Sequence, residues 1–360
     1  MRGLGTPDQI PLMCQLSLGH IYKNAGIPPE KFWFTPEGLA EGYIRMAERY
    51  NFDGILVNVW TGIEKQQTSN SCVCGVGHKV TLENKQSFYC PPNEYPSRLD
   101  YKVEPVHRSI GEVDVESIPV YPNCQAWMNY FGNVLDIVLA KARDRFSIHG
   151  EVGTVFETFL MQFGSLADGL MALLDDPVKS HEIMGRLNRR VILAAVEQCR
   201  RGVDAMKLSS PIAGAGFISR KMYEEFVLPY DQEVVAAIHS VDPGMPCYVH
   251  TCGSIGDRLD LMAKIGAEGL ECLDPPPLGT VDLGKAVGEI GDRMFIKGNL
   301  DSVNELMGHT PEEVRQIALN RLKIGSKCKR GYILSSACSV APDVPPENIL
   351  ALAQAVEEFR

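Results

Sequence analysis

The sequence lacks any apolar run long enough to cross a membrane, and Met1 is not followed by the charged and then apolar segment of a secretory leader. It also lacks an excess of positive charge, since its 35 Lys and Arg residues face 45 Asp and Glu residues, for a net charge of −10. Such a chain is not expected to bind the phosphate backbone of DNA or RNA. We therefore expect a cytoplasmic protein without a membrane or nucleic-acid partner.

The cysteine usage does not indicate a disulfide framework. The eleven cysteines are scattered and odd in number, and in a chain without a leader they are expected to be reduced, some of them as metal ligands. The 360 residues are 45% hydrophobic, which is enough to bury one large core. We expect a single domain over residues 1–360.

Short apolar segments alternate with helical patterns along most of the chain. The apolar segments read as strands at 10–15, 53–60, 146–150, 205–208, 248–253, 269–272, 294–298 and 331–334. This alternation predicts an α/β fold, a (β/α)8 TIM barrel. Residues 61–122 interrupt it with short extended pieces among Gln, Ser, Asn, Gly and Pro, and predict a β-rich insertion after the second strand, a hairpin excursion over one end of the barrel.

Several helix starts are recognisable from their capping residues. Thr35 precedes a proline and is expected to cap a helix, and Thr310 begins a capping box. Residues 176–201 predict one long helix. Residues 219–239 predict another, with Pro229 as a kink inside it.

A metal site is indicated where the fifth predicted strand runs into a loop. His250 and Cys252 are two residues apart, so their side chains point the same way, with Cα atoms about 6.5 Å apart. Cys338, after the last strand, is the best candidate for a third ligand. Three ligands of this kind are typical of a catalytic zinc site with one open position. The alternative is that these are buried core thiols and a hydrogen-bonded core histidine.

Further candidates lie at the ends of other strands, on the face where barrels carry their active sites. Glu271 is a candidate fourth ligand or proton donor, and the alternative is a paired carboxylate that bridges strands. His149 and Glu151 are candidates to orient substrate. Asn299 could contact substrate or brace a loop, and we favour bracing. Asp204 begins a strand and is left out of the site.

The aromatic residues Trp60 and Tyr130, with Trp127 and Phe131, could line a pocket for an aromatic ring. The alternative is ordinary packing. No cluster of Arg or Lys suited to a sulfonate or folate lies near these motifs. Cys72, Cys74, His78 and Cys90 in the insertion could form a second metal site, but their irregular spacing favours loop thiols.

Three segments together resemble a known family. They are His250-x-Cys252-Gly253, the run Gly298-Asn299-Leu300-Asp301, and the Cys338 strand followed by 345–349 (Pro-Pro-Glu-Asn-Ile). This pattern resembles the uroporphyrinogen decarboxylase superfamily and, within it, the zinc-dependent, corrinoid-linked methyltransferase branch. The resemblance is good from about residue 204 to the C-terminus and poor over the first 130 residues. It implies that His250, Cys252 and Cys338 are the zinc ligands.

The chain departs from the decarboxylase itself in one segment. Uroporphyrinogen carries many carboxylates, for which arginine is the natural partner. The decarboxylase pattern has an Arg-rich segment after its first strand, whereas residues 13–20 here contain no Arg or Lys. It also has His near the end of the last strand, where this chain has Cys338. We expect homology to the decarboxylase without its activity.

The resemblance implies an enzyme that transfers a methyl group with Zn2+ as its cofactor. We expect transfer from a small methylated donor, a methoxylated aromatic (O-demethylation), to the Co(I) corrinoid of a partner protein. Two alternatives are a methylcobamide:thiol methyltransferase and uroporphyrinogen decarboxylase. The corrinoid is expected on a partner protein because the chain has no Asp-x-His-x-x-Gly motif for binding it. A homodimer is compatible with the sequence.

A structural zinc protein is the alternative of a different class. It would need a fourth protein ligand, for which Cys247 and Cys272 are nearest in sequence. Cys247 is expected on the opposite strand face from His250, which argues against it.

Overall fold

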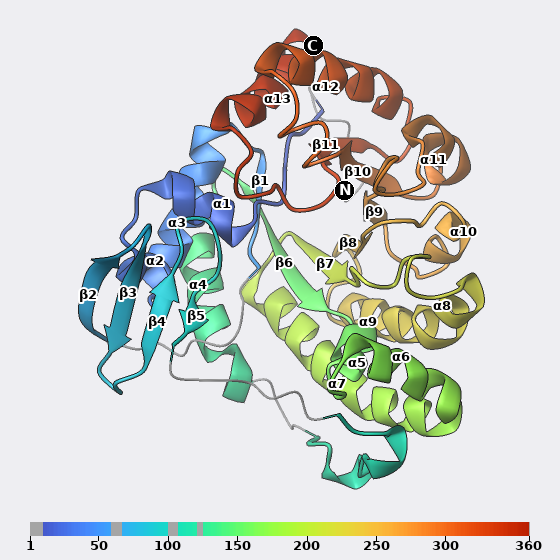
Figure 1. The fold of residues 1–360 in the computed structure, drawn as a ribbon. Coiled ribbons are helices and arrows are strands. Elements are labelled where there is room, and N and C mark those ends of the chain that lie inside the picture. The colour runs from blue at the N-terminus through green and yellow to red at the C-terminus, as the bar shows by residue number, and fades with distance from the viewer. Residues whose placement is uncertain (1–9, 59–66, 100–106, 121–124, 360) are drawn as a thin grey trace.

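The computed structural model describes residues 10–58, 67–99, 107–120 and 125–359, without the side chains of 125–131. At its centre is a parallel sheet whose seven strands lie side by side in chain order (Figure 1). The strands are β1 (Gly54–Leu56), β6 (Ser147–Gly153), β7 (Ala205–Ser209), β8 (Cys247–Thr251), β9 (Gly269–Cys272), β10 (Phe295–Leu300) and β11 (Tyr332–Ser336).

The N-terminal segment joins the two ends of this sheet. Leu12 forms a parallel bridge with Leu334 of β11, and its carbonyl oxygen accepts a hydrogen bond of 2.8 Å from the amide of Asp53, next to β1. The fold is therefore a (β/α)8 TIM barrel, as predicted. The regular strand expected at 10–15 is reduced to isolated bridges, because the amide of Leu12 donates instead to the carboxylate of Asp53 at 2.7 Å.

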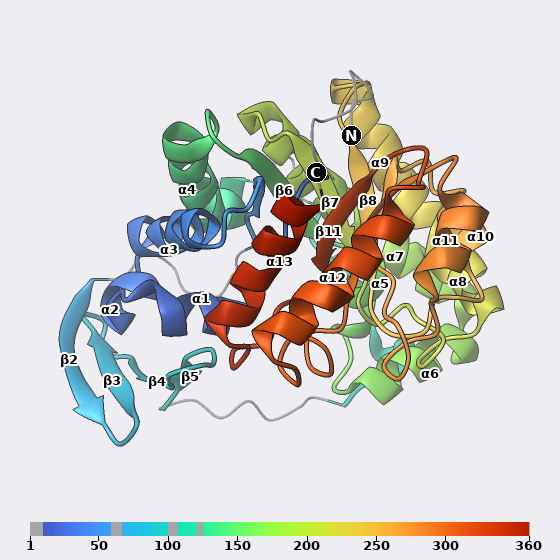
Figure 2. The same ribbon diagram turned by 90° about the horizontal axis from the view of Figure 1, so that it is seen from above.

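Helices surround the strands (Figures 1 and 2). Those that alternate with the strands are α3 (Pro36–Arg49), α4 (Gln125–Ala142), α7 (Pro177–Arg201), α9 (Leu228–Val241), α10 (Leu259–Met262), α11 (Leu283–Ile290), α12 (Pro311–Gly325) and α13 (Pro346–Glu358). Additional helices are α1 (Leu18–Ala25), α2 (Pro29–Phe32), α5 (Val155–Leu160), α6 (Leu166–Asp175) and α8 (Arg220–Phe226). Within the described residues, no helix has both the length and the apolar character that crossing a bilayer requires.

The helix caps predicted from sequence are present. The hydroxyl of Thr35 accepts a hydrogen bond from the amide of Gly38 at 3.0 Å, and Thr310 forms its capping box with Glu313. The helix predicted at 219–239 is two helices, α8 and α9. Pro229 lies in the first turn of α9, where its missing N–H breaks the continuous helix.

A second sheet lies outside the barrel, beside α2 (Figure 2). Its four antiparallel strands are β2 (Thr68–Cys74), β3 (Gly77–Leu82), β4 (Ser87–Cys90) and β5 (Ser97–Arg98). This is the predicted β-rich insertion after the second barrel strand. Residues 107–120 contain two 3-10 turns, η1 (Ile110–Glu112) and η2 (Val115–Ser117), rather than strands. The single domain over 1–360 and the bounds 61–122 stay predictions.

The interior of the barrel has an apolar layer. Its side chains come from the N-terminal segment and five of the strands, and are those of Met13, Leu56, Ala205, Tyr248, Phe295 and Ile333. All six are buried, so this part of the barrel is a packed core rather than a channel. Side chains further along the strands, toward their carboxyl ends, are polar, and they form the site.

Candidate metal centre

The end of β8 carries the first two residues of the site. Side chains alternate along a strand, so Tyr248 and His250 face the barrel interior and Cys247 faces outward. Cys252 follows one residue after the strand ends. His250 is buried and Cys252 is half-buried. The pair therefore lies at the carboxyl end of the strands, where barrel enzymes carry their active sites.

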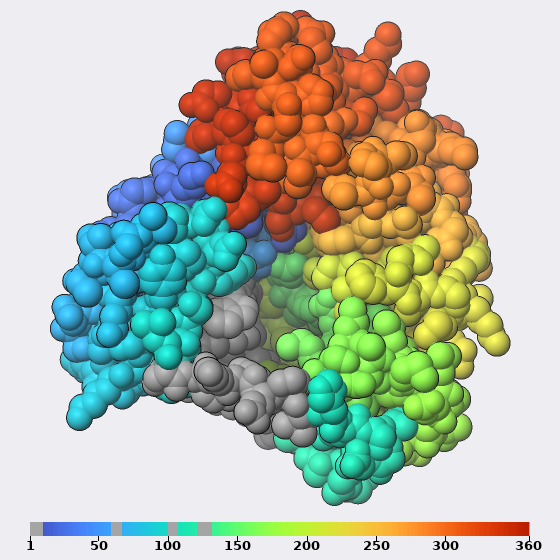
Figure 3. Space-filling model, viewed as in Figure 1, coloured from blue at the N-terminus to red at the C-terminus, as the bar shows by residue number. Residues whose placement is uncertain are grey.

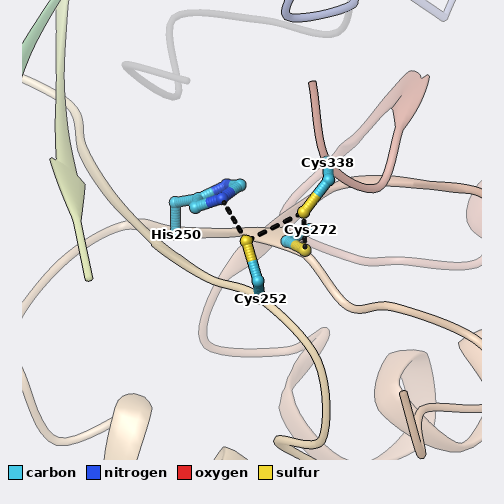
Figure 4. Close-up of side chains that lie close together, drawn as sticks. All are labelled: His250, Cys252, Cys272 and Cys338. Atoms are coloured by element: carbon cyan, nitrogen blue, oxygen red, sulfur yellow. Dashed lines mark hydrogen bonds between the residues drawn. The ribbon is translucent and has the colours of Figure 1, made fainter. Parts of the chain in front are cut away.

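Four ligand atoms meet at this point (Figure 4). Nε2 of His250 lies 3.2 Å from Sγ of Cys252. Sγ of Cys338 lies 2.9 Å from Sγ of Cys252 and 3.6 Å from Sγ of Cys272. All four atoms lie within 4.8 Å of one another. The structure thus brings the three predicted ligands together and adds Cys272 as a fourth.

The donor set fits a zinc ion. Tetrahedral zinc has Zn–S distances of about 2.3 Å and Zn–N distances of about 2.0–2.1 Å, which place neighbouring donor atoms roughly 3.5–3.8 Å apart. The observed neighbours, at 2.9–3.6 Å, need small side-chain shifts to reach that spacing. Thiolate and imidazole donors select zinc over Mg2+ or Ca2+. With four protein donors, the expected open position is filled by Cys272 in this arrangement.

Cys272 reaches the cluster through an unusual backbone conformation. Glu271 faces the barrel interior, so the alternation of β9 would direct Cys272 outward. The φ angles of Cys272 and Leu273 are instead 83° and 57°, a left-handed conformation that is uncommon outside glycine. This turn brings the thiol to the rim. The sequence carries no signal for it, because no glycine marks the position.

Glu271 holds the imidazole of His250 from behind. Its Oε2 lies 2.9 Å from Nδ1 of His250, so the ring presents Nε2 to the thiols. A carboxylate on the remote nitrogen of a ligand histidine is common in zinc proteins and fixes the tautomer. Glu271 was predicted as a ligand or proton donor. Its oxygens are not among the ligand atoms that gather at the cluster, and its contact with His250 fits the alternative of a carboxylate that bridges strands.

Two lysines inside the barrel neutralise this carboxylate. Nζ of Lys207 lies 3.0 Å from Oε2 of Glu271 and 3.2 Å from Oε1 of Glu151, and it donates to Gln15 as well. Lys297 donates to Oε1 of Glu271. Both lysines are fully buried. They were missed from the sequence, where each is a single charge within an apolar strand.

The charge balance keeps Glu271 ionised. Burial would raise its pKa, but Lys207, Lys297 and His250 outweigh burial and hold the pKa of Glu271 well below its usual range. An ionised carboxylate accepts hydrogen bonds and has no proton to give. This arrangement gives the predicted role of Glu271 as proton donor no support, and that role stays a prediction.

His149 lies within the barrel and is fully buried. Its Nδ1 is 3.0 Å from the hydroxyl of Tyr248, and its Nε2 is 3.1 Å from the hydroxyl of Ser147. Burial, with Lys297 nearby, lowers the pKa of His149 to about 3, so the ring is neutral. This placement favours a structural role and gives the predicted substrate contact no support.

Asn299 braces the loop after β9. It is 1% exposed, and its Nδ2 donates to the carbonyl oxygen of Leu273 at 2.9 Å, next to Cys272. This contact agrees with the favoured alternative of bracing rather than substrate binding. Trp60 and the side chains of Trp127, Tyr130 and Phe131 lie outside the described residues, so the aromatic pocket stays a prediction.

The other cysteines are separate from the cluster. Cys72 and Cys74 are exposed on β2, and Cys90 is buried in the same sheet. Among the described residues these thiols form no grouping of ligand atoms, and they lie on strands β2 and β4 rather than in the predicted loops. A second grouping, His239, Cys247 and Glu268, lies at the start of β8. There the Nε2 of His239 is 3.1 Å from the backbone carbonyl oxygen of Met245. This hydrogen bond accounts for the position of the ring without a metal.

Comparison with known proteins agrees with the fold and the family. A family model described as "Uroporphyrinogen decarboxylase (URO-D)" matches residues 99–359. Curated relatives named uroporphyrinogen decarboxylase include those of Pelodictyon phaeoclathratiforme, 26% identical over 71% of this chain and 72% of the relative, and Methylococcus capsulatus, 29% identical over 69% of each chain. Identity at this level leaves the activity of this chain open.

A solved structure of a methyltransferase from Methanosarcina mazei resembles this one over nearly its whole length. The TM-score is 0.76, and the match covers 99% of this chain and 96% of the methyltransferase at 17% sequence identity. This likeness supports the barrel fold. The family match, which spans well over half of the sequence, shows that the chain belongs to the uroporphyrinogen decarboxylase (URO-D) family.

Proposed function

We propose that this protein is a zinc-dependent methyltransferase that exchanges a methyl group between a small substrate and a corrinoid carried by a partner protein. The observation that carries the proposal is the cluster of His250, Cys252, Cys272 and Cys338 at the carboxyl end of the barrel strands. Four protein donors of this kind are typical of structural zinc, so the composition alone does not indicate catalysis. The position of the cluster at the carboxyl ends of the strands, with Cys252 and Cys338 half-buried, favours a catalytic metal.

A zinc ion in this donor set would act as a Lewis acid, lowering the pKa of a substrate thiol or polarising the oxygen of a methyl ether. The chain's own residues prepare that chemistry. Glu271 fixes the ring of His250, and Lys207 and Lys297 offset the carboxylate charge. Cys252 and Cys338 are half-buried, so substrate can approach from their side.

The donor set favours a thiol substrate. Three thiolates and a neutral imidazole leave a zinc site with a net charge of about −1, which weakens its pull on an ether oxygen and keeps a bound sulfur electron-rich. The thiolate would attack the methyl group of methyl-Co(III), and the Co–C bonding pair would stay on cobalt as Co(I). This ranks methylcobamide:thiol methyl transfer first.

Transfer in the other direction is the second candidate. There Co(I) would attack the methyl group of a methoxylated aromatic, and the bonding pair would leave with the phenolate oxygen. This direction of transfer depends on the aromatic pocket that the sequence predicts around Trp60 and Tyr130. Trp60 and the side chain of Tyr130 lie outside the described part of the structure. Zinc would stabilise the developing charge on oxygen in that case.

Exposed apolar side chains on the rim support a macromolecular partner. Met161 follows α5, Phe217 follows β7 and Leu278 follows β9, and they are 81%, 48% and 51% exposed. All three lie in segments between the carboxyl end of a barrel strand and the next barrel helix, on the face where barrel enzymes bind substrate. Figure 3 shows this face hollowed at its centre, between the cyan surface of the insertion and the green surface of the residues after β6. A corrinoid domain would dock there.

Decarboxylation of uroporphyrinogen is the competing activity, because it is the activity for which the curated relatives are named. Residues 13–20 supply no Arg or Lys for the substrate carboxylates, and Lys207 and Lys297 are paired inside the barrel. We expect no conversion of uroporphyrinogen to coproporphyrinogen. Turnover of that substrate would move the function to tetrapyrrole synthesis.

The test of the proposal is a screen in both directions. Methylcobalamin is mixed with a panel of small thiols, and Co(I) cobalamin with methoxylated aromatics and methylamines, while the cobalt absorption is followed. Methyl-Co(III) consumed by a thiol supports the first candidate, and methyl-Co(III) formed from a methoxylated aromatic supports the second. Neither reaction, with free cobalamin or a corrinoid protein, would reject the methyltransferase assignment.

A further inference from the structure

Cys272 differs from the other three members of the cluster. It is fully buried, whereas Cys252 and Cys338 are half-buried. Its backbone is left-handed, with φ of 83°, whereas His250 continues a regular strand. Such conformations in residues other than glycine concentrate at functional sites. The chain therefore holds this thiol in the cluster by an exceptional turn.

Cys272 also lies closer to Asp274 than Cys338 does, whose Sγ is 3.7 Å from Oδ2 of Asp274. Sγ of Cys272 lies 3.2 Å from the same oxygen, and that oxygen accepts a hydrogen bond from the amide of Gly253 at 2.6 Å. Asp274 is itself buried. A protonated Cys272 would thus have a hydrogen-bond acceptor at its present position. A buried S–H group needs such an acceptor.

We propose that Cys272 is the exchangeable ligand of this site, and that it yields its place to the sulfur of an incoming substrate thiol. This rests on the proposed function for the identity of the substrate and on the cluster geometry for the identity of the ligand. His250 is not the exchangeable ligand, because Glu271 holds its ring at 2.9 Å. Cys272 has the shorter contact with Asp274, at 3.2 Å, whereas Cys338 lies 3.7 Å from the same oxygen.

The exchange is balanced in atoms and charge. The S–H bond of the substrate breaks, an S–H bond forms on Cys272, and one thiolate donor replaces another. Cys272 then donates its new hydrogen to Oδ2 of Asp274. When the methylated, neutral thioether departs, Cys272 returns and its proton goes to solvent. This is the one proton that methylation of a thiol by methyl-Co(III) liberates.

The test uses the full chain loaded with Co2+ in place of zinc, and 2-mercaptoethanol as the probe. In the Cys272→Ala variant the thiolate-to-cobalt absorption should fall by about one third, because one of three thiolates is lost. The variant should keep the metal and bind 2-mercaptoethanol at least about tenfold more tightly than the unaltered protein, because the internal competitor is gone. Added thiol should restore the absorption.

Controls separate this inference from the proposed function. Cys328→Ala removes a buried thiol that hydrogen-bonds to Gly291 and Met294 outside the cluster, and it should leave the spectrum and the thiol affinity unchanged. Cys272→Ser keeps a hydroxyl near Asp274, and its thiolate-to-cobalt absorption should equal that of the alanine variant. No corrinoid is present in these measurements, so they can succeed even if methyl transfer is not found.

Three results would overturn the inference. An unchanged cobalt spectrum in Cys272→Ala would show that Cys272 is not a ligand. Equal thiol affinity in the variant and the unaltered protein would show that it does not compete with substrate. Loss of the metal from both Cys272→Ala and Cys272→Ser would show that it is a permanent ligand.

Discussion

Glu271 and His250 form a buried pair in which a carboxylate fixes the orientation of a metal ligand. Oε2 of Glu271 lies 2.9 Å from Nδ1 of His250, across the pairing of β8 with β9 that sets these two residues side by side. Both residues are at most 4% exposed. The position of the imidazole is therefore determined by the sheet and not by the metal.

The first prediction concerns this pair. Glu271→Gln should weaken zinc binding about 10- to 100-fold, because the amide no longer holds the ring as a charged acceptor does. A titration against a chromophoric chelator measures it. Glu268→Gln alters a carboxylate at the start of the same strand, next to Cys247, and should leave the affinity unchanged. Equal affinities in all three proteins would contradict the role of Glu271.

The second prediction concerns the ligands. The purified protein should hold about one zinc per chain, and His250→Ala and Cys338→Ala should each lose most of it. Cys72→Ala and Cys74→Ala should keep it, because these thiols are exposed on β2. Metal analysis after dialysis decides the outcome. Full zinc content in either ligand variant would refute the assignment.

Much of this site could be predicted from sequence, because strand alternation and the ends of strands determine it. His250 and Cys252 share a strand face, and Cys338 follows the last strand, so the barrel topology brings them together. The sequence indicates Cys272 only as one of the two cysteines nearest in sequence for a structural site, since its left-handed φ of 83° reverses the face that alternation predicts. Lys207 and Lys297 could not be assigned, because their partners come from neighbouring strands.

The fold likewise has features that the sequence predicts and features that it does not. Capping residues such as Thr35 act locally and predicted their helices correctly. The strand expected at 10–15 was weaker than predicted because its pairing depends on Asp53, whose carboxylate captures the amide of Leu12. Such a competition between side chain and backbone is not visible in the hydrophobic pattern.

The third prediction concerns the pH dependence of stability. Burial, with the carboxylate of Glu157 nearby, raises the pKa of Asp231 from its ordinary 3.8 to about 8. Its Oδ2 has no hydrogen-bond partner. A raised pKa means that the folded protein is favoured while Asp231 is protonated, and that stability is lost as the pH rises from about 4 toward about 8.

Asp231→Asn should therefore stabilise the protein by about 1–3 kcal/mol near pH 8, and the gain should vanish below about pH 4. Thermal unfolding at several pH values measures it. Glu225→Gln, an exposed position on α8, is the matched control and should show no such trend. A gain that is the same at every pH would contradict the account.

The fourth prediction concerns the rim. Met161→Glu and Phe217→Glu should each lower kcat/KM for a corrinoid protein by about tenfold, because each places a charge in an apolar docking surface. Rates with free methylcobalamin should not change. Val241→Glu is the control, since Val241 is 39% exposed at the end of α9 that leads into β8, away from the rim. Equal losses with the corrinoid protein and free methylcobalamin would reject docking at this surface.

The central claim is that the cluster of three cysteines and one histidine works as a catalytic zinc centre for methyl transfer. The most direct measurement follows the absorption of methylcobalamin mixed with a small thiol and the protein in three states: as purified, stripped of metal, and reloaded with zinc. The account predicts conversion of methyl-Co(III) to Co(I) by the first and third states and not by the second. Conversion at the same rate by the metal-stripped protein would contradict it.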